Sequence, residues 1–171
     1  MRCAWAAAHG GGDRYRRLRL PHLEAIGSGG QGRFAMDIEP KPGTYALVLC
    51  CASKARVRIG RLGTMQLQRG YYIYVGSALG PGGLRARIAH HQRLSPCPHW
   101  HIDYLRAHTR LHCVWLCYDG RRREHEWARA MRKVKGATIP LPGFGASDCR
   151  CSSHLFLLGR SPACLRMREA P

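Results

Sequence analysis

One segment of the sequence carries side chains of the kinds that hydrolyse phosphodiester bonds. Tyr74 lies near the end of an apolar run, and a Gly-rich turn separates it from a basic stretch that contains Arg87 and His91. Arg87 and His91 are four residues apart, so a helix would place both side chains on one face. Together, a phenol, a guanidinium and an imidazole can take a proton from water, neutralise a phosphate and relay a proton. A basic surface helix beside a tyrosine that only packs is the alternative that these residues leave open.

The charge of the chain favours a polyanionic partner such as nucleic acid. The chain has 28 Lys and Arg residues against 10 Asp and Glu residues, which gives a net charge of +18. Most of the basic residues are arginine, whose planar fork binds two phosphate oxygens at once. A GC-rich coding sequence would also enrich arginine, but it would not explain the scarcity of acidic residues. We therefore expect binding to nucleic acid through phosphate contacts.

Length and composition indicate one compact domain and no membrane association. No apolar run approaches the roughly 20 residues that span a bilayer, and the N-terminus lacks the apolar region of a signal peptide. We expect a cytoplasmic protein. Residues 1–35 are Arg- and Gly-rich and are expected to form a disordered basic leader, with a translation start at Met36 as an alternative. We expect the domain to cover residues 36–158 and a C-terminal tail to cover residues 159–171.

Hydrophobic patterning predicts a small α+β fold in which helices flank a central antiparallel sheet. Strands are expected over residues 45–51, 56–59, 71–75, 111–118 and 154–158. Helices are expected over residues 84–93, 100–107 and 124–134, and a Gly-rich loop over residues 141–147.

A second group of residues has metal-binding chemistry. Its members are His99, His101, Asp103, Cys149, Cys151 and His154. Thiolate and imidazole are zinc ligands, but a single residue between two cysteines is an uncommon spacing for zinc. A structural Zn²⁺ site built from Cys149, Cys151, His154 and one of His99 or His101 is therefore the less favoured alternative. We expect instead that these residues line the rim of the phosphodiester site.

Two tripeptides and the basic helix resemble the GIY-YIG nuclease superfamily. Gly43-Thr44-Tyr45 and Tyr74-Val75-Gly76 resemble its paired GIY and YIG motifs, and the Arg-x-x-x-His helix follows them in the expected order. The two motifs are further apart than in compact superfamily members, with a strand-like piece over residues 56–68 between them. Three longer stretches resemble the DUF123 or Uri-type endonuclease-like subgroup. These stretches cover residues 70–78, 99–105 and 143–155.

The resemblance implies a metal-dependent endonuclease that cuts nucleic acid, with DNA favoured over RNA. It implies that Tyr74 contacts the attacking water or acts as the base, and that Tyr45 forms hydrogen bonds in the same site. Arg87 would bind the scissile phosphate, and His91 would assist proton transfer or phosphate binding. Glu124 would hold one Mg²⁺ or Mn²⁺. The alternatives are Glu126 as the ligand, or two glutamates that only stabilise a helix N-terminus.

The resemblance and the sequence together suggest a set of substrate-binding residues around this centre. Arg85 competes with Arg87 for the phosphate, but only Arg87 precedes a histidine by four residues. The full set comprises Gly76, Ser77, Arg85, His99, Trp100, His101, Asp148 and Arg150. Arg121-Arg122-Arg123 is either a solvated turn or a clamp on the nucleic-acid backbone.

Two other functions stay open at the level of the sequence. The first is a non-catalytic nucleic-acid-binding module of the same fold, and the second is a zinc-stabilised interaction protein. No separate recognition domain is apparent in the sequence. A nuclease of this kind would therefore act with little sequence specificity, work on a structured substrate, or depend on a partner protein for targeting.

Overall fold

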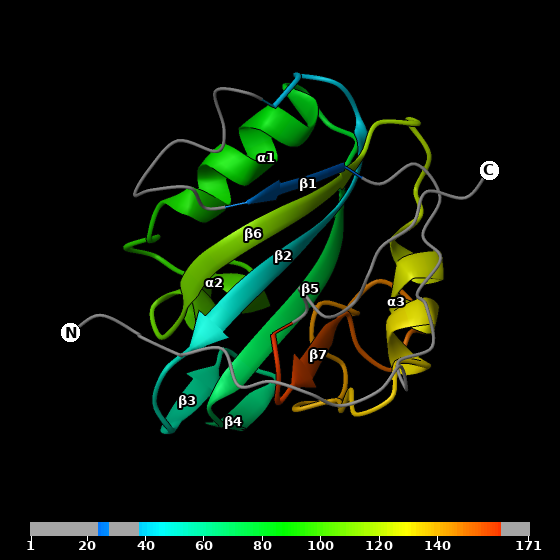
Figure 1. Ribbon diagram of the computed structural model, residues 1–171. Helices are drawn as coiled ribbons and strands as arrows, with labels where there is room; N and C mark the ends of the chain where they lie inside the picture. The colour runs from blue at the N-terminus through cyan, green and yellow to red at the C-terminus, as the bar shows by residue number, and fades with distance from the viewer. Residues whose placement is uncertain (1–23, 28–37, 162–171) are drawn as a thin grey trace.

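The computed structural model describes residues 24–27 and 38–161, and this part of the chain has an α+β fold (Figure 1). Five antiparallel strands form a sheet in the order β1-β6-β2-β5-β7, and β3 and β4 form a separate hairpin. The strands are β1 (Glu24–Gly27), β2 (Gly43–Cys51), β3 (Ala55–Ile59), β4 (Gly63–Leu67), β5 (Gly70–Ala78), β6 (Arg110–Cys117) and β7 (Leu155–Leu158). The helices are α1 (Gly83–Gln92), α2 (His101–Arg106) and α3 (Glu124–Arg132). None of these described helices is long and apolar enough to cross a membrane.

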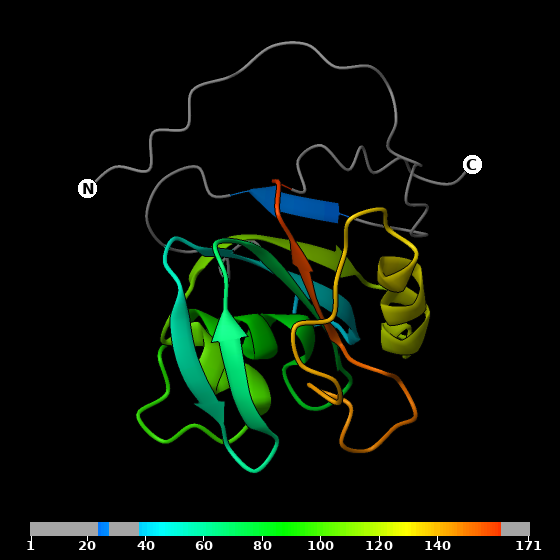
Figure 2. The same cartoon turned by 90° about the horizontal axis from the view of Figure 1, so that it is seen from below.

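The sheet buries both of its faces, which explains the continuous apolar run of β2. Tyr45, Leu47 and Leu49 point to the face covered by α1, α2 and the β3–β4 hairpin. Ala46 and Val48 point to the opposite face, where they join the core that α3 covers. Figure 2 shows the hairpin and the two green helices on one side of the sheet and α3 beside the other. Helices thus flank the sheet as the sequence predicts.

The structure differs from the sequence-based boundaries at several points. Glu24–Gly27 lie within the segment expected to be a leader outside the fold, yet they pair with β6 as an edge strand. The rest of that segment, and residues 162–171 of the tail, lie outside the described residues. The strand expected to end before Gly76 continues to Ala78, because Thr44 and Gly43 of β2 still pair with Ser77 and Ala78. The strand-like piece expected over residues 56–68 is two strands, β3 and β4.

Two glycines on neighbouring strands lie where the packing leaves no room for a side chain. Gly76 lies directly opposite Tyr45, and a Cβ at Gly76 would stand 2.6 Å from the Tyr45 hydroxyl. At Gly43, a Cβ would overlap the carbonyl oxygen of Cys117 on β6. Real Cβ atoms do not approach other heavy atoms this closely, so both positions need glycine. Packing therefore explains the glycine that begins the first motif, Gly43-Thr44-Tyr45, and the glycine that ends the second, Tyr74-Val75-Gly76.

Thr44 connects the central sheet to the beginning of α3. Its hydroxyl accepts a hydrogen bond from the Arg123 backbone N–H at 2.9 Å and donates to the Arg121 carbonyl at 3.2 Å. The turn ahead of α3 is thereby held against β2. These hydrogen bonds therefore fix the position of Glu124, the first residue of α3, relative to the sheet.

Candidate functional site

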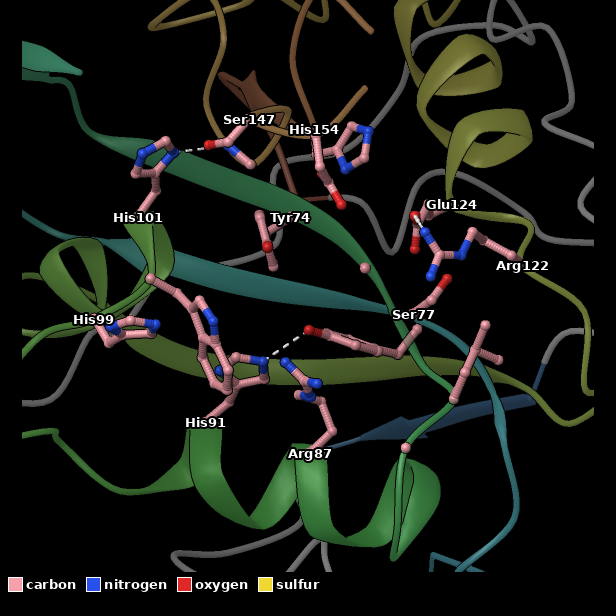
Figure 3. A pocket seen from close by; sticks show the side chains of 17 residues that line it. Tyr74, Ser77, Arg87, His91, His99, His101, Arg122, Glu124, Ser147 and His154 are labelled. Atoms are coloured by element: carbon pink, nitrogen blue, oxygen red, sulfur yellow. Dashed lines mark hydrogen bonds and ion pairs between the residues drawn. The ribbon is translucent and has the colours of Figure 1, made fainter. Parts of the chain in front are cut away.

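A polar cleft of about 440 Å³ opens between α1, the ends of β2 and β5, the N-terminus of α3 and the Gly-rich loop (Figure 3). It brings together residues that are far apart in the sequence. Twelve of the residues singled out in the sequence line it: Tyr45, Tyr74, Gly76, Ser77, Arg87, His91, His99, Trp100, His101, Glu124, Asp148 and His154. Arg122 and Ser147 also line it and were not assigned to the site.

A cluster of three rings forms the floor of the cleft. Tyr45 and His91 share a hydrogen bond of 2.8 Å between the phenol oxygen and Nε2. The Tyr74 ring centroid lies 6.4 Å from those of both Tyr45 and His91. Within the described part of the chain, the Tyr74 hydroxyl makes no hydrogen bond. The Tyr74 hydroxyl is therefore available to a water molecule or a phosphate, whereas the Tyr45 hydroxyl is already engaged.

Burial holds all three rings in their neutral forms at neutral pH. It raises the pKa of Tyr45 and of Tyr74 well above the ordinary tyrosine value, and the nearby charge of Arg87 only partly offsets this. Burial also lowers the pKa of His91 to about 3, with the neighbouring His90 and Arg87 acting in the same direction. The cleft thus offers neutral hydrogen-bonding groups rather than a ready tyrosinate or imidazolium.

Arg87 supplies positive charge to the cleft and is held over an aromatic ring. Its guanidinium carbon lies 4.4 Å from the centroid of the Trp100 ring, a cation–π contact between α1 and the residue before α2. Arg85, two residues earlier, donates from Nε to the Ile38 carbonyl at 2.7 Å and does not line the cleft. The helix therefore presents Arg87 to the cleft and turns Arg85 away from it.

The phase of α3 separates the two glutamates at its beginning. The Glu124 side chain is only 11% exposed and lines the cleft, with Oε1 3.7 Å from Arg122 Nη1. The Glu126 side chain is 56% exposed and pairs with Arg123 at 2.8 Å, outside the cleft. Carboxylate and hydroxyl oxygens are the ligands that Mg²⁺ and Mn²⁺ prefer. Glu124 is therefore the side chain that would hold one such ion, and Ser77 and Asp148 line the same cleft.

Asp103 shapes the rim of the cleft without entering it. Its Oδ2 accepts hydrogen bonds from the backbone N–H groups of His99 and Trp100, and its Oδ1 lies 3.3 Å from Nε2 of His90. Burial opposes its ionisation, but these hydrogen bonds outweigh that effect and lower the pKa of Asp103. Asp103 therefore fixes the turn that carries His99 and Trp100 to the rim.

His101 connects α2 to the Gly-rich loop. Its Nδ1 accepts a hydrogen bond from the Gly145 N–H at 3.0 Å, and its ring packs against Phe144. Gly145 in turn packs on Tyr74, where a Cβ would lie 2.8 Å from the ring. His101 thus orients the loop that covers one side of Tyr74.

The structure corrects the expected zinc group in one respect. Cys149, Cys151 and His154 do lie together, but their fourth neighbour is His125 of α3 rather than His99 or His101. Arg150 also lies apart from the main cleft, in a second cleft of about 420 Å³ beside α3. The sequence offered no spacing signal for His125, because its contact with the loop depends on how α3 packs against β5 and β7.

The fold and the cleft define a small α+β domain with a polar, arginine-bearing site. Residues 44–170 match the family described as "Domain of unknown function DUF123", and the chain belongs to this family. No protein of curated function and no solved structure shows significant similarity to the chain.

Proposed function

We propose that this protein is a metal-dependent nuclease of the GIY-YIG type, which hydrolyses phosphodiester bonds in nucleic acid, with DNA favoured as the substrate. One observation carries the proposal: the five side chains that such a reaction needs line a single cleft, although they come from four separate elements. They are Tyr45 of β2, Tyr74 of β5, Arg87 and His91 of α1, and Glu124 of α3. The resemblance of the two tyrosine tripeptides to the GIY and YIG motifs supports the same function.

Each side chain takes a role from its surroundings. Arg87 is the cationic side chain that approaches the phosphate and offsets charge in the transition state. Tyr74, with an unengaged hydroxyl and a raised pKa, positions the attacking water rather than deprotonating it. The Tyr45–His91 pair lies beside Tyr74, and burial keeps both of its rings neutral. Glu124 would hold one Mg²⁺ or Mn²⁺, which supplies Lewis-acid polarisation of the phosphate and stabilises the leaving oxygen when bound.

The surface charge supports a nucleic-acid partner. A net charge of +18 gives phosphate contacts that weaken steeply as salt rises. Arg87 and Arg122 line the cleft, where they would attract the phosphates of a bound substrate. We propose that the described domain acts with little sequence specificity, works on a structured substrate, or depends on a separate targeting protein.

A non-catalytic nucleic-acid-binding module is the second candidate, and one observation favours it. The raised pKa of both tyrosines and the lowered pKa of His91 make each of these three rings a poor proton acceptor at pH 7. Such a module would bind DNA with the same salt dependence and would leave it intact in Mg²⁺.

The test is cleavage of labelled linear, nicked and branched DNA and of RNA by the full chain, in Mg²⁺, in Mn²⁺ and in EDTA. We expect metal-dependent cleavage that Arg87→Ala abolishes. Arg56→Ala is the charge-matched control, because Arg56 is exposed on β3 away from the cleft. Binding of every substrate without cleavage of any would reject the nuclease and support the non-catalytic module.

A further inference from the structure

Two cysteine thiols and two histidine imidazoles lie together at the junction of α3 and the segment that leads into β7. His125 belongs to α3, Cys149 and Cys151 belong to the loop after the Gly-rich turn, and His154 immediately precedes β7. One side-chain ligand atom from each lies within 4.8 Å of the other three. Such a meeting of two thiols and two imidazoles is the donor set of structural zinc sites.

Two of the distances between ligand atoms are close to those of tetrahedral coordination. Zinc bonds of about 2.3 Å to sulfur and about 2.05 Å to nitrogen, at tetrahedral angles, separate a sulfur from a nitrogen by about 3.6 Å. Cys149 Sγ lies 3.5 Å from His154 Nε2, and Cys151 Sγ lies 3.3 Å from His125 Nδ1. The side chains therefore need only small shifts to surround one ion.

The surroundings of the four ligands are also those of a structural site. His154 is almost fully buried, while His125, Cys149 and Cys151 are half-buried. Both cysteines are free thiols. Zinc binding would deprotonate both thiols, and the charge of the ion would offset the repulsion between the two thiolates. With four protein ligands, the ion would have no open position for a substrate, so its role would be to hold the fold together.

We propose that His125, Cys149, Cys151 and His154 bind one structural Zn²⁺. The ion fastens the N-terminal turn of α3 to the loop that carries the two cysteines. The two cysteines and His154 come from one short segment, and His125 completes the group from α3.

The proposed zinc site borders the main cleft on two sides. His125 follows Glu124 directly in α3, and its Nε2 lies 3.7 Å from the Glu124 carboxylate. The His154 carbonyl accepts a hydrogen bond from the Val75 N–H at 2.9 Å, next to Tyr74 on β5. Zinc would thereby fix the position of Glu124 relative to Tyr74. The importance of this position for cleavage rests on the proposed nuclease function, whereas the zinc site itself does not.

The direct test is the zinc content of the purified full chain, measured by mass spectrometry of the metal. We expect about one zinc per chain in the unaltered protein and little in His125→Ala or Cys151→Ser. His108→Ala and Cys97→Ser are the matched controls, because both residues are exposed and lie outside the group. Both controls are expected to keep the zinc. Unaltered protein without zinc, or zinc retained in both ligand variants, would overturn the proposal.

A spectroscopic measurement keeps the proposal testable if the ligand variants do not fold. Replacing the metal of the unaltered protein with Co²⁺ is expected to give near-ultraviolet thiolate-to-cobalt absorption and the intense visible bands of tetrahedral cobalt. Absence of the thiolate bands would contradict the site. Neither measurement involves nucleic acid, so zinc can be present even if no cleavage occurs. Glu124→Gln is expected to keep its zinc, which separates the structural ion from the ion proposed in the cleft.

Discussion

The Tyr45 hydroxyl lies 2.8 Å from His91 Nε2, and both side chains are almost fully buried beneath the cleft. The hydrogen bond joins the beginning of β2 to the end of α1. It depends on Gly76, which leaves room for the Tyr45 ring on the neighbouring strand. A glycine, which has no side chain, therefore controls the position of the buried pair.

Gly76→Ala adds only one methyl group, but it is expected to displace the Tyr45 ring and destabilise the protein. The added methyl group would stand 2.6 Å from the Tyr45 hydroxyl, so the ring must move and the hydrogen bond to His91 must lengthen or break. Overpacking of a buried position costs about 1–3 kcal/mol. We expect a lower thermal unfolding midpoint and, if the proposed function holds, loss of cleavage. Gly159→Ala, which adds a methyl group in open space, is the control. Equal unfolding midpoints for the two variants would show that the strand tolerates the methyl group.

His91 is expected to make the protein sensitive to acid. Its pKa is about 3 in the folded protein because of burial, against an ordinary value of 6.5 in the unfolded chain. Between these values the unfolded state binds more protons, so stability from this group falls as the pH drops from about 6.5 towards 3, by at most about 1.4 kcal/mol per pH unit. Above pH 6.5 the contribution is constant.

The comparison that isolates this effect is urea unfolding of the unaltered protein and of His91→Gln at several pH values between 4 and 7. Glutamine does not titrate, so the stability of the variant should change less with pH. His101, His112 and His154 also have lowered pKa values and contribute equally to both proteins. Parallel pH curves for the two proteins would mean that His91 does not carry the effect.

Trp100→Leu is expected to weaken the function of Arg87 without removing its charge. The indole ring lies 4.4 Å from the guanidinium carbon and holds it over the cleft. A cation–π contact contributes about 0.5–2 kcal/mol, which corresponds to a roughly 2- to 30-fold loss in kcat/KM. Leu94→Ala, at an exposed apolar residue outside the cleft, should leave kcat/KM unchanged. A rate for Trp100→Leu equal to that of the unaltered protein would show that Arg87 does not need the ring.

Local patterning was sufficient to predict the elements that carry the site. The apolar run after Gly43 and the basic stretch around Arg87 gave the central strand and α1 with nearly the observed boundaries. The choice between Arg85 and Arg87 also followed from spacing, because only Arg87 shares a helix face with His91. These features depend on residues close together in the chain, where the period of a helix or strand fixes direction.

Features that depend on packing between distant elements could not be predicted in the same way. The sequence favoured Glu124 over Glu126 only by resemblance, and the exposure of the two side chains depends on how α3 lies against the sheet. His125 joins Cys149 and Cys151 for the same reason, across 24 residues or more of chain. The pairing of Glu24–Gly27 with β6 was missed because four residues in a Gly- and Arg-rich segment carry too short a pattern to indicate a strand.

The most direct test of the nuclease proposal compares two glutamates that lie two residues apart on α3. Cleavage of labelled DNA in Mn²⁺ would be measured for the unaltered protein, Glu124→Gln and Glu126→Gln. Loss of the cleft carboxylate removes the proposed cation ligand and should slow cleavage more than about 100-fold, whereas Glu126→Gln should cleave at the unaltered rate. No cleavage by the unaltered protein, or equal rates for all three proteins, would contradict the proposed function.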